Sequence, residues 1–439
     1  MRKNGVEKYI HFIVTVAIFC IFWWLHLNYI DVKVDTRYSI FVCVIYAVLF
    51  YSFAKTYNCY QLGYDSSGEL IYSQAIAGLI CISGSYLGIS LIWNKFYPVR
   101  MFALAFVVQM LWNIVWSIVA TKIYFVKNPR RAAAVIYQDT EDLVRIREIY
   151  DSKLFRITKE IRIDEGVESS ILLNEILEYK VLFVTGISAT LRNGIAKYCK
   201  EEGVEGYFIP HVGDVIMAGA PHAQSFSVPL QLVERANPDI GYLFVKRSFD
   251  MLFALLGIVI TSPIMAIIAA AIKINDGGSV IYKQVRLTKG GKHFNMFKFR
   301  SMKENAEEDG VARLASEHDD RITKVGKVIR ACRFDELPQL FNILSGDMSF
   351  VGPRPERPEL AAELMKEIPA FDLRLQVKAG LTGYAQVYGK YNTDSLDKLK
   401  LDLMYINRMN WFEDLKLMFA TVKILFIKES TEGVREQEG

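Results

Sequence analysis

Two adjacent carboxylates, Asp335 and Glu336, stand in a basic and apolar segment at residues 330–339. Because consecutive helical residues point about 100° apart, one carboxylate could attack a substrate while the other binds a metal ion. Arg330 adds positive charge nearby. In the alternative interpretation, the two acids only favour the positive end of a helix dipole, and Arg333 pairs with Glu336. The pattern alone supports both interpretations equally.

Residues 246–303 contain ten Lys or Arg residues and only two acids. A bias of this size indicates an anionic partner, such as lipid headgroups or phosphates, although a solvated basic face beside a membrane would also show it. Within this stretch, residues 294–300 alternate phenylalanine with polar residues, which predicts a strand with one buried face. Lys298 and Arg300 would then share the opposite face and point toward one place.

Arg354 stands between Pro353 and Pro355. Proline fixes its own φ angle, so the two rings would stiffen the loop on both sides of the arginine. A stiff loop suits a guanidinium group that must meet a phosphate as a rigid fork. An ordinary proline-rich turn has the same pattern, so the function depends on what surrounds the loop.

An apolar run of 22 residues, 251–272, lies inside the basic stretch and carries Ser262 and Pro263 at its middle. Proline inside a helix removes a backbone hydrogen bond and bends the helix. A straight crossing would leave one basic flank outside, against the preference of Lys and Arg for the cytoplasmic side. We therefore expect a re-entrant helix, residues 248–274, that bends at Ser262 and Pro263 and leaves the membrane by the face it entered.

Four further apolar runs precede residue 128, at 9–29, 38–54, 70–93 and 101–121. Their lengths are close to the roughly 20 residues that a spanning helix needs. An even number of crossings puts both ends of this region on the same side. Basic residues flank the first and the fourth run, which favours the cytoplasmic side for both ends.

The middle of the chain, residues 129–240, has a soluble composition. Strands at 132–137, 181–185 and 206–210 and a helix at 191–202 predict a small parallel α/β module. A nucleotide-binding unit would show a glycine-rich turn after its first strand, and this chain has none there. A scaffold, dimerisation or regulatory role is therefore favoured over nucleotide binding.

The composition sets wider limits. The 439 residues are 52% hydrophobic with a net charge of +4, which argues against disorder and against a nucleic-acid partner. The six cysteines are scattered, so we expect neither a disulfide framework nor a zinc site. Residues 399–427 form an amphipathic tail whose last apolar run is too short to span a membrane; Trp411 and Phe412 are expected at headgroup depth.

Six motifs together resemble those of the bacterial sugar transferases, the polyprenyl-phosphate sugar-1-phosphate transferases that begin capsule, exopolysaccharide and O-antigen repeats. The resemblance covers about residues 246–428. The motifs stand in the family's order: Lys246-Arg247 with Asp250, Ser262-Pro263, Lys298-Phe-Arg300, Asp335-Glu336-Leu-Pro-Gln, the loop 346–355 and the segment 381–387. The layout of four helices, an α/β module and this domain is similar to the long, bipartite family members.

The resemblance implies a reaction and its residues. Asp335 would attack the sugar-bearing phosphate of a UDP-sugar, expel UMP and form a covalent phosphosugar that undecaprenyl phosphate then accepts. Glu336 would hold Mg2+ or help to deprotonate the lipid phosphate. Basic residues at matching positions would grip phosphates, and a further carboxylate also matches, giving the set Lys298, Arg300, Arg330, Arg354 and Asp402. The protein would lie in the bacterial inner membrane with its catalytic domain on the cytoplasmic face, and a homodimer stays open.

We therefore expect a membrane α+β protein with three parts. These are a four-helix transmembrane domain (1–128), a Rossmann-like α/β module (129–240) and a catalytic domain with the re-entrant helix and interfacial amphipathic helices (241–439). Two other functions stay open: a membrane-tethered sugar-nucleotide dehydratase or epimerase, and a non-enzymatic scaffold of polysaccharide export. No motif identifies the sugar.

Overall fold

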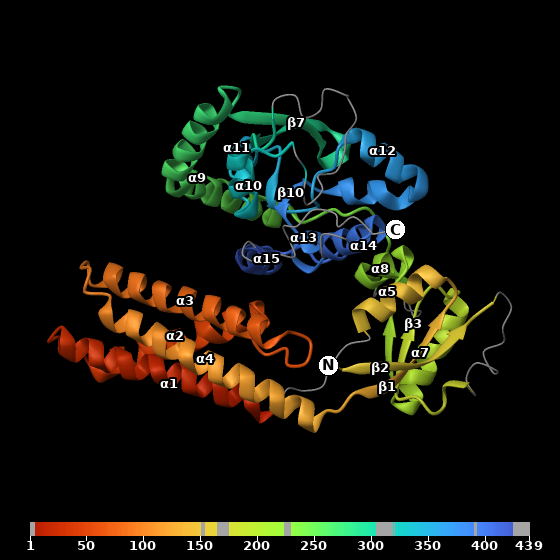
Figure 1. Ribbon diagram of the computed structural model, residues 1–439, viewed down its shortest axis with the longest axis horizontal. Helices are drawn as coiled ribbons and strands as arrows, with labels where there is room; N and C mark the ends of the chain where they lie inside the picture. Colours follow the sequence, from red (N-terminus) through yellow and green to blue (C-terminus); the bar gives the residue numbers. More distant parts are fainter. Residues whose placement is uncertain are drawn as a thin grey trace. The chain divides into compact units, whose positions relative to one another are not determined.

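The computed structural model describes residues 5–150, 154–164, 175–223, 230–303, 319, 321–389 and 393–424. Two compact units, Met1–Pro210 and His211–Gly439, make up the chain. Figure 1 shows the elements of each unit.

The first unit begins with four long helices that pack against one another, α1 (Val6–Tyr29), α2 (Thr36–Thr56), α3 (Ser67–Ile92) and α4 (Arg100–Lys127) (Figure 1). They coincide with the four predicted apolar runs. Among the described residues, these helices and one more, Ile240–Asn275, are long and apolar enough to cross a membrane. The chain is therefore a membrane protein with a mixed α/β soluble region.

Buried polar side chains join these four helices. His11 lies 2.9 Å from Oδ1 of Asn113 and 3.1 Å from the hydroxyl of Tyr60. Gln109 donates to the hydroxyl of Tyr46 at 2.8 Å. Such bonds fix which helix faces which, because a polar group without a partner is costly in an apolar surrounding.

A parallel four-stranded sheet with the order β2-β1-β3-β4 follows in the same unit. Its elements are β1 (Arg131–Tyr137), α5 (Thr140–Tyr150), β2 (Phe155–Arg162), β3 (Val181–Val184), α7 (Ala189–Glu202) and β4 (Glu205–Phe208). The predicted parallel α/β module is confirmed. Helix α5 and strand β2 were not predicted; β2 is an edge strand whose side chains are mostly polar and do not alternate regularly.

The crevice at the carboxyl ends of β1 and β3 holds a protein carboxylate. Asp142 Oδ2 accepts a hydrogen bond from Thr185 at 2.9 Å and lies 2.9 Å from where a Cβ on Gly186 would stand. Ligands of open α/β sheets bind at this kind of crevice, where neighbouring strands connect in opposite directions. A carboxylate there disfavours a nucleotide phosphate, in agreement with the missing glycine signature.

The second unit is built around the long helix α9 (Ile240–Asp276) and the antiparallel hairpin β7 (Ile281–Leu287) and β8 (His293–Phe299). The strand predicted at 294–300 is confirmed as β8. Around them lie α8 (Val212–Gly219), β5 (His222–Ala223), β6 (Leu230–Gln231), η1 (Lys289–Gly291), α10 (Lys324–Ala331), η2 (Phe334–Glu336), α11 (Gln339–Ser345), β9 (Ser349–Val351), α12 (Pro358–Glu367), η3 (Pro369–Gln376), β10 (Gly380–Thr382), α13 (Tyr384–Tyr388), α14 (Ser395–Ile406) and α15 (Trp411–Ile424).

Residues 211–223 and 230–240 belong to this second unit, whereas we predicted a boundary after residue 240. Val215 of α8 is buried in the same core as Leu403 of α14. Its carbonyl oxygen accepts a hydrogen bond from Asn407 at 2.8 Å. These two contacts place α8 with the elements that follow it.

Helix α9 contains Pro263 and, in Figure 1, turns part-way along its length. Proline has no N–H, so the carbonyl of Val259 loses the donor it would have in a regular helix. The hydroxyl of Ser262 donates to that carbonyl at 2.8 Å instead. The pair Ser262-Pro263 thus provides both the bend and a replacement hydrogen bond.

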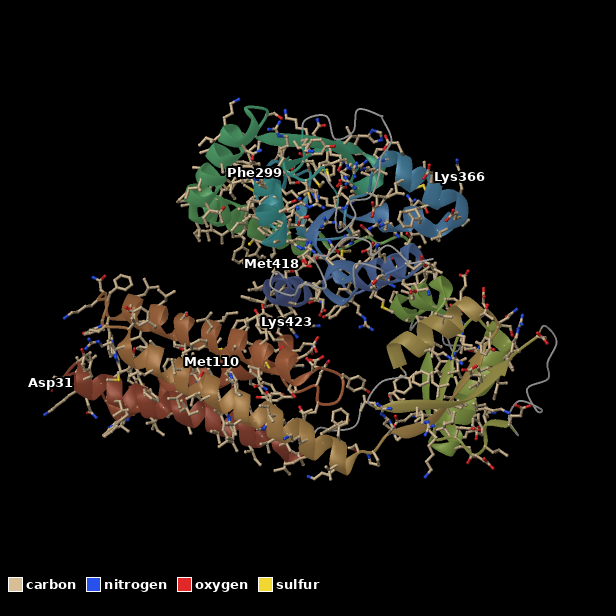
Figure 2. The ribbon with its side chains drawn as sticks, viewed as in Figure 1. Asp31, Met110, Phe299, Lys366, Met418 and Lys423 are labelled. Atoms are coloured by element: carbon tan, nitrogen blue, oxygen red, sulfur yellow. The ribbon has the colours of Figure 1, made fainter. Side chains whose placement is uncertain are left out.

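Each half of α9 shares a buried cluster with a residue of strand β8. Before Pro263, Ala254 shares a buried cluster with Met296. After it, Ile268 shares one with Phe299, which Figure 2 labels. Ala254 and Ile268 would be about 21 Å apart along a straight helix, whereas Met296 and Phe299 are about 10 Å apart along their strand. The bend thus places one buried residue from each half of α9 in a cluster with the same strand.

Candidate active site

Helix α11 is fixed to strand β8 by one side chain, and this places the two carboxylates. Asn342 is fully buried; its Oδ1 accepts from the backbone N–H of Phe297 at 2.9 Å, and its Nδ2 donates to the carbonyl of Asn295 at 2.8 Å. The turn η2 immediately precedes α11, so Asp335 and Glu336 lie beside Lys298 of β8.

The backbone reaches η2 through a left-handed residue. Arg333 has φ +54° and ψ +22°, a conformation that costs a non-glycine residue of order 1 kcal/mol. Its carbonyl accepts from the N–H of Glu336 at 3.2 Å, which closes the turn. Strain of this kind is kept where the surrounding structure requires it, and here it sets the direction of the two carboxylates.

Glu336 is the centre of a cluster of cations. Its Oε1 accepts from Arg354 at 2.7 Å and from Lys298 at 3.3 Å, and its Oε2 lies 3.9 Å from Arg333. Burial acts to raise the pKa of Glu336, but Arg354 and Lys298 outweigh it and hold the pKa well below its ordinary value. The side chain is therefore a permanent anion that neutralises its neighbours.

Asp335 has a different environment from Glu336. Its side chain makes no hydrogen bond or ion pair with any residue that the structure describes. Burial and the charge of Glu336 raise its pKa, while Lys298 and Arg330 act in the opposite direction. The carboxylate thus lies among cations without being bound by one, which is the condition of an available nucleophile.

The cations also affect one another. Burial lowers the pKa of Lys298 even though Glu336 acts to raise it. Glu336 raises the pKa of Arg354, which stays charged. Arg330, on α10, makes no side-chain hydrogen bond or ion pair within the described residues, and its charge acts on Asp335 and on Asp319. Among the described residues, Lys298 and Arg354 bind Glu336 through their side chains, whereas Arg330 makes no such bond.

The loop 353–356 holds Arg354 rigidly. Its four consecutive carbonyl oxygens all accept hydrogen bonds, at 2.9, 2.9, 3.1 and 3.0 Å. The donors are, in that order, the N–H of Gly380, Arg374 Nη2, Arg286 Nη1 and the N–H of Leu287. The stiff loop predicted from the two prolines is thus fixed mainly by groups outside it.

Close backbone contact explains the glycines of two sequence motifs. Gly352 follows β9 and lies so close to Gly380, the first residue of the parallel strand β10, and to Gly383 that a Cβ on either of these two glycines would overlap the backbone of Gly352. Only glycine allows this approach. The segments 346–355 and 381–387, distant in the sequence, therefore act as one support for Arg354.

Two predicted site residues lie outside the cluster. Arg300 is buried, and its guanidinium lies against Gly278, just after α9. Asp402 is 1% exposed and lies 2.7 Å from Arg374 Nη2 in a buried ion pair. The assignment of Asp402 to direct phosphate binding does not fit this position, because a substrate cannot reach a buried and paired carboxylate.

Comparison with known proteins identifies the family. The model of the family described as bacterial sugar transferase matches residues 241–428. A putative undecaprenyl-phosphate N-acetylgalactosaminyl 1-phosphate transferase of Bacillus subtilis is 49% identical over 134 residues, which are 30% of this chain and 74% of the relative. The chain belongs to the bacterial sugar transferase family.

Longer sugar transferases match the same region. A UDP-N-acetylgalactosamine-undecaprenyl-phosphate N-acetylgalactosaminephosphotransferase of Aeromonas hydrophila is 42% identical over 191 residues, which are 43% of this chain and 45% of the relative. A UDP-glucose:undecaprenyl-phosphate glucose-1-phosphate transferase of Escherichia coli K12 is 37% identical over 219 residues, 49% of this chain and 45% of the relative. The matched region is thus a little under half the length of these sugar transferases.

Sequence reasoning missed the residues that support the site. Arg286, Arg374 and Asn342 make the contacts that fix the loop and the carboxylates. Arg286 belongs to the basic stretch 246–303 without standing out in it, and Arg374 and Asn342 stand in no pattern that predicts chemistry. The one usable signal was polarity at buried positions, such as an asparagine within the apolar face of α11. Such a signal shows that a partner exists and does not identify the partner.

Proposed function

We propose that this sugar transferase moves a sugar 1-phosphate from a UDP-sugar to undecaprenyl phosphate and releases UMP, as the first membrane step of exopolysaccharide, capsule or O-antigen synthesis. The observation that carries the proposal is the contrast between the two carboxylates of the dyad Asp335-Glu336. Glu336 is bound by Arg354 and Lys298, whereas the neighbouring Asp335 lies among cations and makes no hydrogen bond or ion pair with a described residue. The names of the relatives support the same class of reaction over a dehydratase, an epimerase or an export scaffold.

In the first step, a carboxylate oxygen of Asp335 attacks the phosphorus next to the sugar. A bond forms between that oxygen and phosphorus, and the bond from phosphorus to the oxygen that bridges the two phosphates breaks. UMP leaves with the bridging oxygen and its electron pair. A covalent intermediate divides a difficult transfer between a soluble and a lipid substrate into two easier steps.

In the second step, a phosphate oxygen of undecaprenyl phosphate attacks the same phosphorus. The bond to Asp335 breaks, the carboxylate is restored, and the lipid carries a diphosphate-linked sugar. Phosphoryl transfer depends mainly on positioning and on neutralising the negative charge that spreads over the phosphate oxygens. Lys298, Arg330 and Arg354 supply that charge around Asp335.

Glu336 is the residue that we propose as a ligand of Mg2+. The described residues contain no group of three or more His, Cys, Asp or Glu side chains that could hold a metal. Mg2+ commonly takes one or two protein carboxylates and completes its shell with water and substrate phosphates. Glu336 Oε2 lies outside the hydrogen bonds to Arg354 and Lys298, so it fits this role. A bound ion would neutralise charge on the diphosphate.

We also propose that α9 is re-entrant and that the catalytic unit lies on the cytoplasmic face of the inner membrane. The bend at Pro263 and the buried clusters that each half of α9 shares with a residue of β8 support this topology. On α15, Trp411 and Phe412 are 45% and 66% exposed, which suits a helix at the interface. Single cysteines at positions 246 and 283, with the native cysteines removed, should react only with reagents that reach the cytoplasm. Labelling of position 283 from outside intact cells would rule the topology out.

The test of the chemistry is Asp335→Asn, which is nearly isosteric and lacks a nucleophilic carboxylate. Incubation with a UDP-sugar labelled in its β-phosphate should label the wild type covalently and leave this variant unlabelled. Asp372→Asn, at an exposed carboxylate of the same unit, is the matched control and should be labelled like the wild type. Near-normal UMP release by folded Asp335→Asn would refute the covalent mechanism. A panel of UDP-sugars in the same assay would identify the sugar.

A further inference from the structure

We propose that Arg374, held by Asp402, is a positioning residue that fixes Arg354 in the active site. The inference rests on the proposed function, because it assigns to these two buried residues a role in the same reaction. Arg374 is 4% exposed and belongs to η3, and Asp402 is 1% exposed and belongs to α14. Neither can touch a substrate.

The contacts form a continuous path to the site. Asp402 Oδ2 lies 2.7 Å from Arg374 Nη2, and the same nitrogen donates to the carbonyl of Arg354 at 2.9 Å. Arg374 Nη1 lies 3.6 Å from Glu356 Oε1. The side chain of Arg354 then donates to Glu336 at 2.7 Å. The path thus runs from a buried carboxylate to the dyad through one guanidinium and one peptide carbonyl.

The bonded carbonyl is the one whose orientation matters. Pro353 and Pro355 have fixed φ angles and Pro355 confines Arg354 to extended backbone, so rotation about ψ of Pro353 and φ of Arg354 is the main freedom left, and it turns the Arg354 residue with its carbonyl. A guanidinium group is planar and rigid, and it meets a carboxylate and a carbonyl at fixed angles. By holding that carbonyl, Arg374 fixes the direction in which the side chain of Arg354 leaves the backbone.

Stability alone does not account for this arrangement. The free energy that two buried charges lose by desolvation is about as large as the free energy that they gain by attraction. Well-packed apolar side chains in the same space often make a protein at least as stable. Burial raises the pKa of Asp402 to about 6 even though Arg374 acts to lower it. The fold keeps two charges where apolar groups would serve, and the bond to the Arg354 carbonyl is what those charges make possible.

The test is a double-mutant cycle in the full-length protein, with UMP release as the assay. Arg354→Gln should lower kcat by about a hundredfold, in the range seen for lost transition-state donors. Asp402→Asn should lower kcat by about tenfold, since small displacements of a positioned group cost this much or more. If Asp402 acts through Arg354, then adding Asp402→Asn to Arg354→Gln should lower kcat by less than twofold.

A matched control separates positioning from general destabilisation. Asp414 is another buried carboxylate of this unit, paired with Lys246 at 2.8 Å and outside the path to Arg354. Whatever factor Asp414→Asn imposes on kcat should be the same with and without Arg354→Gln. Melting temperatures show that each variant is folded. Should Asp402→Asn fail to fold, Arg374→Lys replaces it in the cycle, because one ammonium group keeps the charge but cannot span the carbonyl and the carboxylates.

The outcomes are distinct. Loss of the Asp402→Asn effect in the Arg354→Gln background, with an unchanged Asp414→Asn effect, supports the positioning role. Equal factors in both backgrounds overturn it. A wild type that releases no UMP from any UDP-sugar contradicts the proposed function itself, and active wild type with independent effects contradicts only the role of Arg374 and Asp402.

Discussion

Replacing Glu336 by glutamine removes one negative charge from the site and leaves its shape nearly unchanged. The amide oxygen can still accept from Arg354 and Lys298, but both bonds lose their ionic acceptor. A bond to a charged group contributes about 1 kcal/mol more than a neutral one. Two bonds give about 2 kcal/mol, with little more expected because the Arg354 side chain is 38% exposed. For a unit of this size, the melting temperature should fall by about 4–8 °C.

The same substitution should strengthen the binding of a diphosphate. Four cations, Lys298, Arg330, Arg333 and Arg354, act on the dyad against its two carboxylates, so the local net charge rises from +2 to +3. With one repulsive charge removed, UDP should bind roughly tenfold more tightly. The turnover number should fall, because Arg354 and Lys298 lose the group that orients them.

Two measurements check this reasoning, scanning calorimetry and titration with UDP in the absence of divalent cations. Glu336→Asp is the control, because it keeps the charge but shortens the reach toward Arg354; its affinity for UDP should stay near that of the wild type. Weaker binding of UDP by Glu336→Gln, with an unchanged melting temperature, would refute the assignment of Glu336 as the anion that balances these cations.

Three further outcomes are expected. Transfer should slow as the pH falls through the pKa of Asp335, which burial and Glu336 raise above 3.8, because only the ionised carboxylate attacks. In Glu336→Gln this decrease in rate should begin at lower pH, and an unchanged pH profile would contradict the influence of Glu336 on the pKa of Asp335. Pro263→Ala returns a backbone N–H to α9 and should straighten the helix, so that transfer decreases. A cysteine at position 283 should then become accessible from outside in part of the molecules, and unchanged labelling would show that the bend does not depend on the proline. A fragment of residues 211–439 should melt several degrees above a fragment of residues 242–439, because only the longer fragment keeps α8 in the core. Equal melting temperatures would support a domain boundary after residue 240.

The sequence by itself determined the features that depend on neighbouring residues. Runs of about 20 apolar residues set the four N-terminal helices, because length and hydropathy are enough to indicate a spanning segment. Proline bends a helix in which it stands, so Pro263 predicts the bend of α9, and the alternation of apolar and polar residues along 294–299 predicts strand β8. The order of six motifs also indicated the family, since it requires no knowledge of which residues touch.

The tertiary structure decided which of these residues work together. Asp335 and Glu336 differ because Arg354 and Lys298 reach one carboxylate and not the other, and nothing in two adjacent acids predicts which one is bound. Asp402 and Arg300 have the residue types of a phosphate site, yet packing puts both outside the cluster around the dyad. Contacts between residues far apart in the chain depend on how the elements pack, and the spacing of residues along the chain does not predict that packing.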